Sequence, residues 1–595
     1  MLGLAVILGV FSFFVAASSH HITDADVWAK LALGAYVWRF GAPPHHDFFA
    51  FTPVLPQYVD HEWGAGTVFY GLLKLFGPAS LMWLKIGLCF GAILVAALAG
   101  RRSGCSWSVL LLLAIPAVAC IQLGYVPVIR SHTFTYFFFA ITLLCLEEIQ
   151  RSTHEDSAPL KSFCLRSWPA FLVIAVMLLW VNVHGGFVAG LGSIAVYTGV
   201  ALIKDNRLFK ASSHFPRGEP VGSDQSKSGL RTVPMNQPSA QSSSLSSRGG
   251  EDRGEEVVSL PLPSKACRDE PACNVVRNSS RHLRTLLLVV LSSLAVTFIN
   301  PYGFKFWSYL LPAVLAKRPL IAEWQPLPLF AIDVFLPFRI LFLLVVISLL
   351  AGWKGTKKSP TGLLMLTITA FLAWRSRRHA PFFGVASLCF VGPYLAASLA
   401  RLSSRVPAAL LARVSPPTAL VTIYGIVALF VAIDRLPHAS MQSLSPVGHD
   451  PVREADILQL AHAQGNLATP FHWGSYLAWR LFPSVKISMD GRYEAAFPES
   501  TFQLNNALFD ASRPDWDRLI REYQVDYVIL DLAQERLRPQ QLLERGYVLI
   551  WQTTGSSALL ALEKHAVKLR QVANQLPPTT INPLDASITD RWWAR

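Results

Sequence analysis

Two aspartates separated by a single residue, Asp24 and Asp26, follow the first apolar stretch of the chain. In an extended or looped segment, residues i and i+2 point the same way, so both carboxylates can face one site. One could take a proton from an incoming hydroxyl or amine as a general base. The other could orient that group or hold a divalent cation. The structural alternative is that one aspartate caps a helix beginning near Val27.

Four arginines are candidates for binding an anion, namely Arg130, Arg375, Arg377 and Arg378. Guanidinium groups bind phosphate oxygens in pairs, so a lipid phosphate is a natural partner. The alternative is that these arginines only anchor the chain to anionic headgroups.

Other polar residues lie in segments that we expect at the same membrane face. They are Asp60, His61, Glu62, His132, Asn182, His184, Asn300, Tyr302, Glu323 and His379. The glycines after His184 predict a tight turn, and Asn300-Pro301-Tyr302-Gly303 is typical of a helix-ending turn; direct contact with a ligand remains the alternative for both. Five histidines in the loop after the first span (20, 21, 45, 46 and 61) match no closed zinc ligand set. A metal site is therefore unknown, and a divalent cation is the one cofactor that the aspartates could hold.

The composition indicates that these residues belong to a membrane protein. Of 595 residues, 52% are apolar and 15% charged, whereas soluble proteins are usually about 25% charged. The net charge of +14 is typical of cytoplasmic loops in a membrane protein, so we predict no nucleic-acid partner. Eight cysteines without a CxxC motif indicate neither a disulfide framework nor a compartment.

Apolar stretches long enough to cross a bilayer predict about eleven spans. They are 2–18, 79–100, 107–126, 133–149, 168–183, 186–203, 284–300, 329–350, 360–375, 380–400 and 416–434. Basic loops fall on one side only if 64–77 and 303–318 lie on the outer surface without crossing. The first stretch could be a signal peptide, but it lacks a basic start, which favours an uncleaved anchor. We therefore expect a multi-pass membrane protein with its C-terminus outside.

Four regions follow from this topology. Residues 1–204 form an N-terminal membrane half with a large outer loop at 19–78, and 284–434 form the second membrane half. Between them, 205–283 is rich in Ser, Gly, Pro and charge, which predicts a disordered cytoplasmic insert. Residues 435–595 predict a soluble extracytoplasmic α/β domain, with a hairpin about Thr554-Gly555.

In the soluble domain, Asp490 and Arg492 follow a predicted strand. There they could contact an acceptor or the membrane region. An internal Asp490–Arg492 ion pair, or a turn at Gly491, is slightly favoured. No predicted span has a buried Asp or Glu, which disfavours a transporter coupled to ions or protons.

Several short motifs together resemble a known class. The chain contains "DADVWAKLALG", "HDFFAFT", "DHEW", "VNVHGG", "NPYG", "AEW" and "WGSYLAWRLFPSVKISMDGRYE". This set is similar to uncharacterised bacterial membrane proteins of the GT-C type, and the resemblance implies that the chain lies in a bacterial inner membrane. More distantly, the chain resembles protein O-mannosyltransferases and aminoarabinose transferases. The resemblance covers about residues 22 to 530 apart from the insert, and departs at His46–Phe49, where the group tends to have Asp-Pro-Phe-Ser.

The resemblance implies a mainly α, polytopic GT-C-like fold and a glycosyltransferase that uses a polyprenyl-phosphate-sugar donor. In that class an acidic residue directly after the first span is the catalytic base, a position matched here by Asp24 or Asp26. Asp24 is slightly favoured, because it lies nearer the end of the first span and so nearer a lipid phosphate, whereas Asp26 could instead begin the following helix. Transfer to an unknown extracytoplasmic acceptor would then invert the sugar carbon, and the arginines would stabilise the departing phosphate. The alternative is a non-catalytic scaffold or subunit of a cell-envelope complex with the same shape.

Overall fold

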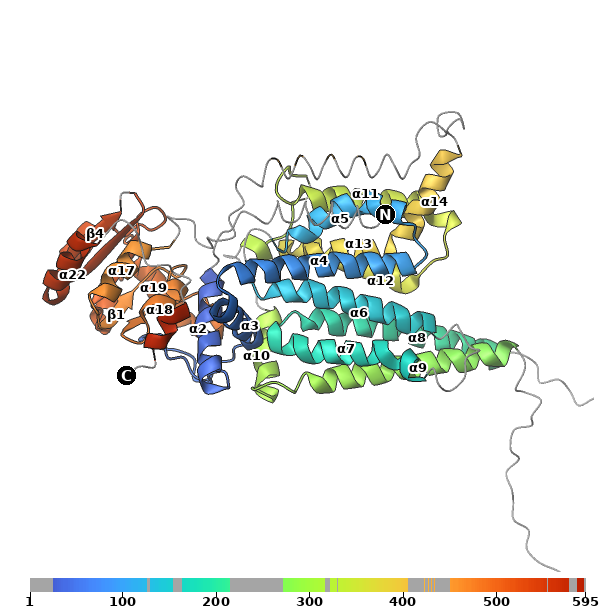
Figure 1. The fold of residues 1–595 in the computed structure, drawn as a ribbon, viewed down its shortest axis with the longest axis horizontal. Helices are drawn as coiled ribbons and strands as arrows, with labels where there is room; N and C mark the ends of the chain where they lie inside the picture. The colour runs from blue at the N-terminus through green and yellow to red at the C-terminus, as the bar shows by residue number, and fades with distance from the viewer. Residues whose placement is uncertain are drawn as a thin grey trace, which may run out of the picture.

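The computed structural model describes residues 25–125, 129–152, 163–213, 271–315, 322–328, 330–404, 450–553, 555–576 and 586–592, with four single positions between 422 and 433. It confirms the predicted fold class: the chain is mainly helical, with a small C-terminal sheet (Figure 1). Asp24, the first predicted span, most of the last one and the centre of the insert lie outside the described residues.

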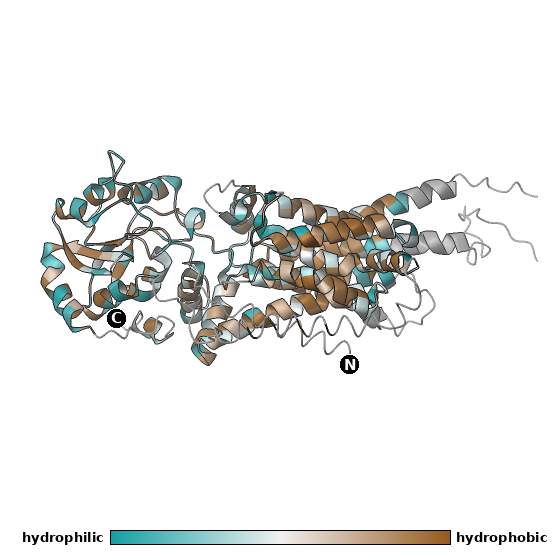
Figure 2. Cartoon of the chain, turned by 90° about the horizontal axis from the view of Figure 1, so that it is seen from above, coloured by the Kyte–Doolittle hydropathy of each residue, from teal (hydrophilic) through white to brown (hydrophobic). Residues whose placement is uncertain are grey.

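In the described residues, ten helices form an elongated bundle that is mostly apolar (Figure 2). They are α4 (Ala79–Arg102), α5 (Trp107–Gln122), α6 (His132–Ser152), α7 (Phe163–Val183), α8 (Phe187–Ser213), α9 (Pro271–Val296), α11 (Leu336–Gly352), α12 (Pro360–Arg375), α13 (Ala380–Phe390) and α14 (Gly392–Ser403). In the described part of the chain, 4 helices are long and apolar enough to cross a membrane, or 5 with a pair bent by 61° that includes α13 and α14. The protein is therefore a multi-pass membrane protein; the count of eleven spans stays a prediction.

Two of the predicted spans differ in detail from the helices. The stretch 329–350 becomes helical only at Leu336, because the Asp333 side chain accepts the backbone N–H of Phe335 at 2.9 Å and ends the preceding loop. The stretch 380–400 is divided at Val391, beside Pro393. Pro393 lies in the first turn of α14 and has no backbone N–H, so it removes one helical hydrogen bond at this break.

Three helices lie across one end of the bundle, the end nearest the C-terminal domain: α2 (Ala25–Phe40), α3 (Trp63–Phe76) and α10 (Phe304–Leu315) (Figure 1). We call this the domain-facing end. Helices α2 and α3 cross closely at Gly34. A side chain at this position would overlap the carbonyl of Gly66, so glycine is what allows the close approach. The ends of α8 and α9 that flank the insert lie at the opposite end (Figure 1). The orientation of the chain relative to the cell stays a prediction.

The C-terminal domain contains a five-stranded sheet in the order β2-β1-β3-β5-β4. The strands are β1 (Gly465–Ala468), β2 (Val485–Ile487), β3 (Tyr527–Asp531), β4 (Tyr547–Thr553) and β5 (Ser557–Leu562). β1 pairs in parallel with β2 and β3, and β5 pairs antiparallel with β3 and β4. The helices are α17 (Val452–Leu460), α18 (Gly474–Leu481), α19 (Glu499–Leu508), α20 (Arg518–Glu522), α21 (Pro539–Leu543) and α22 (Glu563–Gln575).

The loop between α2 and α3, residues 41–62, adds to this sheet beside β2. Ala50 pairs in parallel with Ile487. The N–H of Phe51 donates to the Ile487 carbonyl at 3.0 Å, and the N–H of Ile487 donates to the Phe49 carbonyl at 3.0 Å. The same loop therefore joins the C-terminal sheet at Ala50 and leads into α3 at Trp63.

Arg492 connects this loop to the C-terminal domain. Its guanidinium lies 2.8 Å from Asp490 and 2.5 Å from Asp47, and its side chain is 3% exposed. The internal Asp490–Arg492 ion pair favoured by the sequence is present. The second partner, Asp47, comes from the α2–α3 loop, so Arg492 also makes the contact with the membrane part that was the alternative.

Candidate functional site

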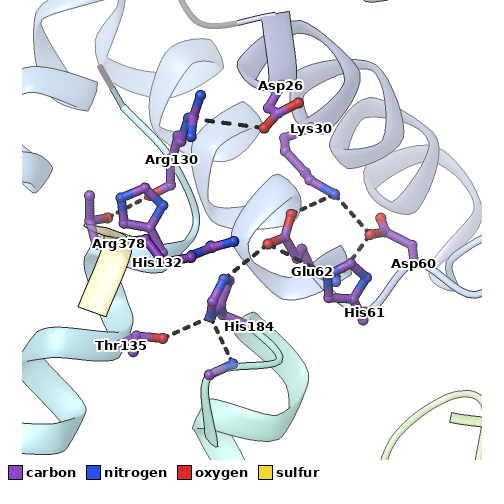
Figure 3. A network of polar contacts seen from close by, with 12 residues as sticks. Asp26, Lys30, Asp60, His61, Glu62, Arg130, His132, Thr135, His184 and Arg378 are labelled. Carbon is purple, nitrogen blue, oxygen red and sulfur yellow. Dashed lines mark hydrogen bonds and ion pairs between the residues drawn. The ribbon is translucent and has the colours of Figure 1, made fainter. Parts of the chain in front are cut away.

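Asp26 lies in the first turn of α2, with its carboxylate turned toward Arg130 (Figure 3). Asp26 Oδ2 is 4.0 Å from Arg130 Nε, and the Asp26 side chain is 48% exposed. Its pKa is raised to about 7, first because the surrounding protein displaces water from the carboxylate, and then because Glu62 repels its charge, while Lys30 opposes the shift. An accessible carboxyl with a pKa near neutrality can exchange a proton at physiological pH.

Lys30, one turn after Asp26, binds two carboxylates at the start of α3. Lys30 Nζ lies 3.1 Å from Asp60 Oδ1 and 2.9 Å from Glu62 Oε2. Burial alone would raise the pKa of Glu62, but the charge of Lys30, together with His61 and His184, holds it well below its usual value. Glu62 therefore stays negatively charged. Its charge repels the Asp26 carboxylate and so favours the protonated form of Asp26.

His184 follows α7 and orients Glu62 from the other side. Its Nδ1 accepts the N–H of Gly186 at 2.8 Å and lies 2.8 Å from Thr135 Oγ1. A backbone N–H can only donate, so the ring proton must be on Nε2, which lies 3.3 Å from Glu62 Oε1. Burial lowers the pKa of His184 well below its usual value, which leaves a neutral ring whose Nε2 faces Glu62. A side chain at Gly186 would overlap Thr135 and His184, so glycine is required there.

Of the four candidate arginines, two meet near Asp26. Arg130 lies 2.5 Å from Glu323 Oε2, and Arg378 lies 3.6 Å from Glu323 Oε1. Arg378 also lies over the Trp324 ring, with 4.5 Å between the guanidinium carbon and the ring centroid. Burial would raise the pKa of Glu323, but Arg130 and Arg378 outweigh it and lower the pKa. An internal carboxylate therefore stands between the two guanidinium groups.

The other two arginines point elsewhere. Arg377 donates to the Pro326 carbonyl at 3.4 Å and lies over the Phe335 ring. Arg375, the last residue of α12, is exposed. Neither shares the Glu323 carboxylate in the contacts of the described residues.

The remaining predicted residues mostly hold the segments around the site in place. His132 donates to the Gly124 carbonyl at 2.8 Å, and the His379 ring packs edge-on against Trp324. His61 Nε2 lies 3.7 Å from Glu62 Oε1. Thr135, which receives a 3.0 Å hydrogen bond from Trp180, and Lys30 belong to the same network but were not predicted.

The asparagine and tyrosine motifs close turns at the domain-facing end. Asn300 accepts the N–H of Tyr302 at 2.9 Å, which fits the predicted helix-ending turn. Tyr302 donates to the Pro44 carbonyl at 3.2 Å and accepts the N–H of Asp60 at 3.1 Å. Asn182 accepts the indole N–H of Trp63 at 3.2 Å. These contacts tie α3, α7 and the α9–α10 connection together beneath the site.

Within the described residues, no group of three or more His, Cys, Asp or Glu side chains could hold a metal ion. The divalent cation suggested by the aspartates stays a prediction, because Asp24 lies outside those residues.

Structural neighbours of the chain are oligosaccharyltransferase and ArnT, both GT-C glycosyltransferases. The oligosaccharyltransferase of Archaeoglobus fulgidus, tethered with an acceptor peptide, has a TM-score of 0.49 at 13% identity over 89% of this chain and 69% of that one. ArnT from Cupriavidus metallidurans has a TM-score of 0.47 in the apo state at 11% identity, and 0.45 when bound to undecaprenyl phosphate at 11%; both comparisons cover 95% of this chain and 98% of ArnT. No family model and no curated protein matches the chain.

The class of these neighbours is the one that the sequence motifs resemble. With TM-scores below 0.5, these similarities assign neither a substrate nor a reaction to this chain.

Proposed function

We propose that this protein is a membrane glycosyltransferase that moves a sugar from a polyprenyl-phosphate donor to an acceptor at the domain-facing end of the bundle. The observation that carries the proposal is the position of Asp26, an accessible carboxyl with a pKa of about 7 that faces Arg130. Transfer of a sugar from a phosphate leaving group needs a base for the acceptor and cationic groups for the phosphate, and Asp26 lies beside Arg130. The membrane is that of a bacterial cell, with the C-terminal domain outside.

In this mechanism Asp26 takes the proton from an acceptor hydroxyl or amine as that group attacks the sugar carbon. The new bond forms on the face opposite the phosphate, the carbon–oxygen bond to the phosphate breaks, and the sugar carbon is inverted. The electron pair leaves with the lipid phosphate, whose charge Arg130 and Arg378 stabilise. Asp24 remains a second candidate for the base, and the C-terminal domain would help to bind the acceptor.

Glu323 occupies the two arginines that the lipid phosphate would need. Because it pairs with both Arg130 and Arg378, a lipid phosphate must displace its carboxylate or share the two guanidinium groups with it. Hydrogen bonds to charged groups contribute about 1.5–3 kcal/mol. Glu323→Gln should therefore bind undecaprenyl phosphate up to about 10–100-fold more tightly than the wild type.

The test uses purified protein in lipid nanodiscs. Binding of undecaprenyl phosphate is compared with binding of uncharged undecaprenol, and transfer is followed from a radiolabelled pool of polyprenyl-phosphate sugars. Asp26→Asn should retain lipid binding but lose about 10²–10⁴-fold in turnover, the usual contribution of a general base. An Asp26→Asn protein with wild-type turnover would show that Asp26 is not the base.

The same ion pairs favour one alternative, a non-catalytic scaffold of a cell-envelope complex. Lys30 already pairs with Asp60 and Glu62, and Glu323 already pairs with both Arg130 and Arg378. A site completed by its own side chains can be purely structural. If neither the wild type nor Glu323→Gln prefers undecaprenyl phosphate over undecaprenol, the scaffold is the better account.

A further inference from the structure

The segment that precedes α11 exposes large apolar side chains. Phe330 is 97% exposed, Ile332 is 94% exposed and Val334 is 72% exposed. Contiguous apolar surface of this kind marks a contact with a partner or with a membrane. Residues 330–336, which we call the apolar loop, need an occupant that covers them.

The apolar loop is continuous with a surface that already faces lipid. Exposed apolar residues recur every three or four positions along α11, on one helical face. They are Leu336, Ile340, Leu343, Ile347 and Leu350. Because α11, with the short turn after it, is long and apolar enough to cross a membrane and only 28% of its most apolar stretch is buried, this face lies against acyl chains. The apolar surface therefore runs past the start of the helix and onto the loop.

The charges in and near the apolar loop are neutralised within the chain. Arg339 binds Asp333 with two hydrogen bonds of 2.7 and 3.1 Å, and it also donates to the Pro328 carbonyl at 3.0 and 3.1 Å. The Arg339 side chain is 12% exposed. A paired and hydrogen-bonded charge can approach an apolar medium at a much lower cost than an isolated one.

Basic side chains flank the apolar loop at the same end of the bundle. The N–H of Leu327 donates to the Trp374 carbonyl at 3.1 Å, and the N–H of Arg377 donates to the Gln325 carbonyl at 3.1 Å. These bonds fix the approach to the loop beside Arg375, which is exposed. Arginine near an apolar surface at the bilayer boundary fits the phosphates of lipid headgroups.

We propose that the apolar loop is a membrane-interface anchor, with Phe330 and Ile332 among the acyl chains of the leaflet at the domain-facing end. Arg375 and Arg377 then lie at the level of the headgroup phosphates. The anchor does not depend on the chain being a transferase. It fixes the depth of the segment that begins with Glu323, seven residues before Phe330.

Site-directed spin labelling tests this placement. Cys164, Cys267 and Cys273 are first replaced by serine, while the five buried free cysteines remain. A nitroxide is then attached in Phe330→Cys and in Ile332→Cys proteins. Each is reconstituted in nanodiscs of phosphatidylcholine with some phosphatidylglycerol. Oxygen, which concentrates among acyl chains, and a water-soluble nickel chelate are the two relaxing agents.

Two further labelled variants calibrate the measurement. Ile340→Cys lies on the lipid-facing stripe and is 51% exposed in the wild type; Val567→Cys lies on α22 and is 82% exposed. The ratio of oxygen to nickel accessibility should exceed unity at 330, 332 and 340 and fall below unity at 567. A ratio at 330 and 332 like that at 567 would place the loop in water. Low accessibility to both agents would mean that a protein surface covers it, and either result would overturn the proposal.

Discussion

Replacing Arg492 by methionine should release the α2–α3 loop from the C-terminal domain. The substitution keeps an unbranched apolar stem but leaves two carboxylates, Asp47 and Asp490, with side chains that are 1% exposed and have lost their shared cation. Removing one partner of a buried ion pair costs about 3–5 kcal/mol. At about 1.4 kcal/mol for each factor of ten, that cost corresponds to about 10²–10⁴-fold more opening of the loop.

Hydrogen–deuterium exchange of the intact protein in nanodiscs measures this opening. The reporters are the amides of Phe51 and Leu55, which donate to the carbonyls of Ile487 at 3.0 Å and Ala496 at 2.8 Å. In Arg492→Met, peptides that cover 48–56 should exchange faster by the factor given above, up to the limit set by global unfolding. If Arg492→Met does not fold, Asp47→Asn should show a smaller increase, because the Asp490–Arg492 pair survives.

The matched control is Arg518→Met. Arg518 pairs with Glu522 at 2.6 Å, but their side chains are 54% and 44% exposed. Exposed ion pairs contribute about 0–1 kcal/mol, so exchange at 48–56 should not change. Equal protection of Phe51 and Leu55 in the wild type, Arg492→Met and the control would refute the view that this ion pair holds the loop.

Three further outcomes are expected. Burial raises the pKa of Glu454, whose hydrogen bonds from Ser557 and Thr553 only oppose the shift, so its stabilisation is present in acid and is lost as pH rises through the folded-state pKa. Glu454→Gln should therefore raise the melting temperature in mildly alkaline buffer but not in acid. Asp456→Ala strands the buried Arg480 and should cost about 3–5 kcal/mol of unfolding free energy, measured by urea-dependent exchange of β3 amides. If the C-terminal domain is extracytoplasmic, an impermeant maleimide should label Val567→Cys in intact cells.

Local patterns in the sequence were sufficient for the elements but not for the charge pairs of the site. Apolar stretches such as 79–100 became helices close to their predicted bounds, and the hairpin about Gly555 is present. The pairing of Glu323 with Arg130 joins residues 193 positions apart. Such a contact depends on how the helices pack, and no periodicity in either segment encodes it.

Lys30 is the residue that sequence reasoning could have found. It is the one charged residue between Asp26 and Gly34, and it lies one helical turn after Asp26, where an opposite charge is favourable. The role of the α2–α3 loop could not be found in this way. Backbone pairing between Phe51 and Ile487 leaves no distinctive side-chain signal in either segment.

The parallel pairing of Ala50 with Ile487 also affects how soluble the C-terminal domain is when it is separated from the membrane region. β2 is an outermost strand, and unprotected strand edges are templates for aggregation. Expressed without residues 41–62, the domain would present Val485–Ile487 to other copies of itself. Solubility of this domain in isolation therefore depends on a short piece of chain that precedes β2 by more than 400 residues.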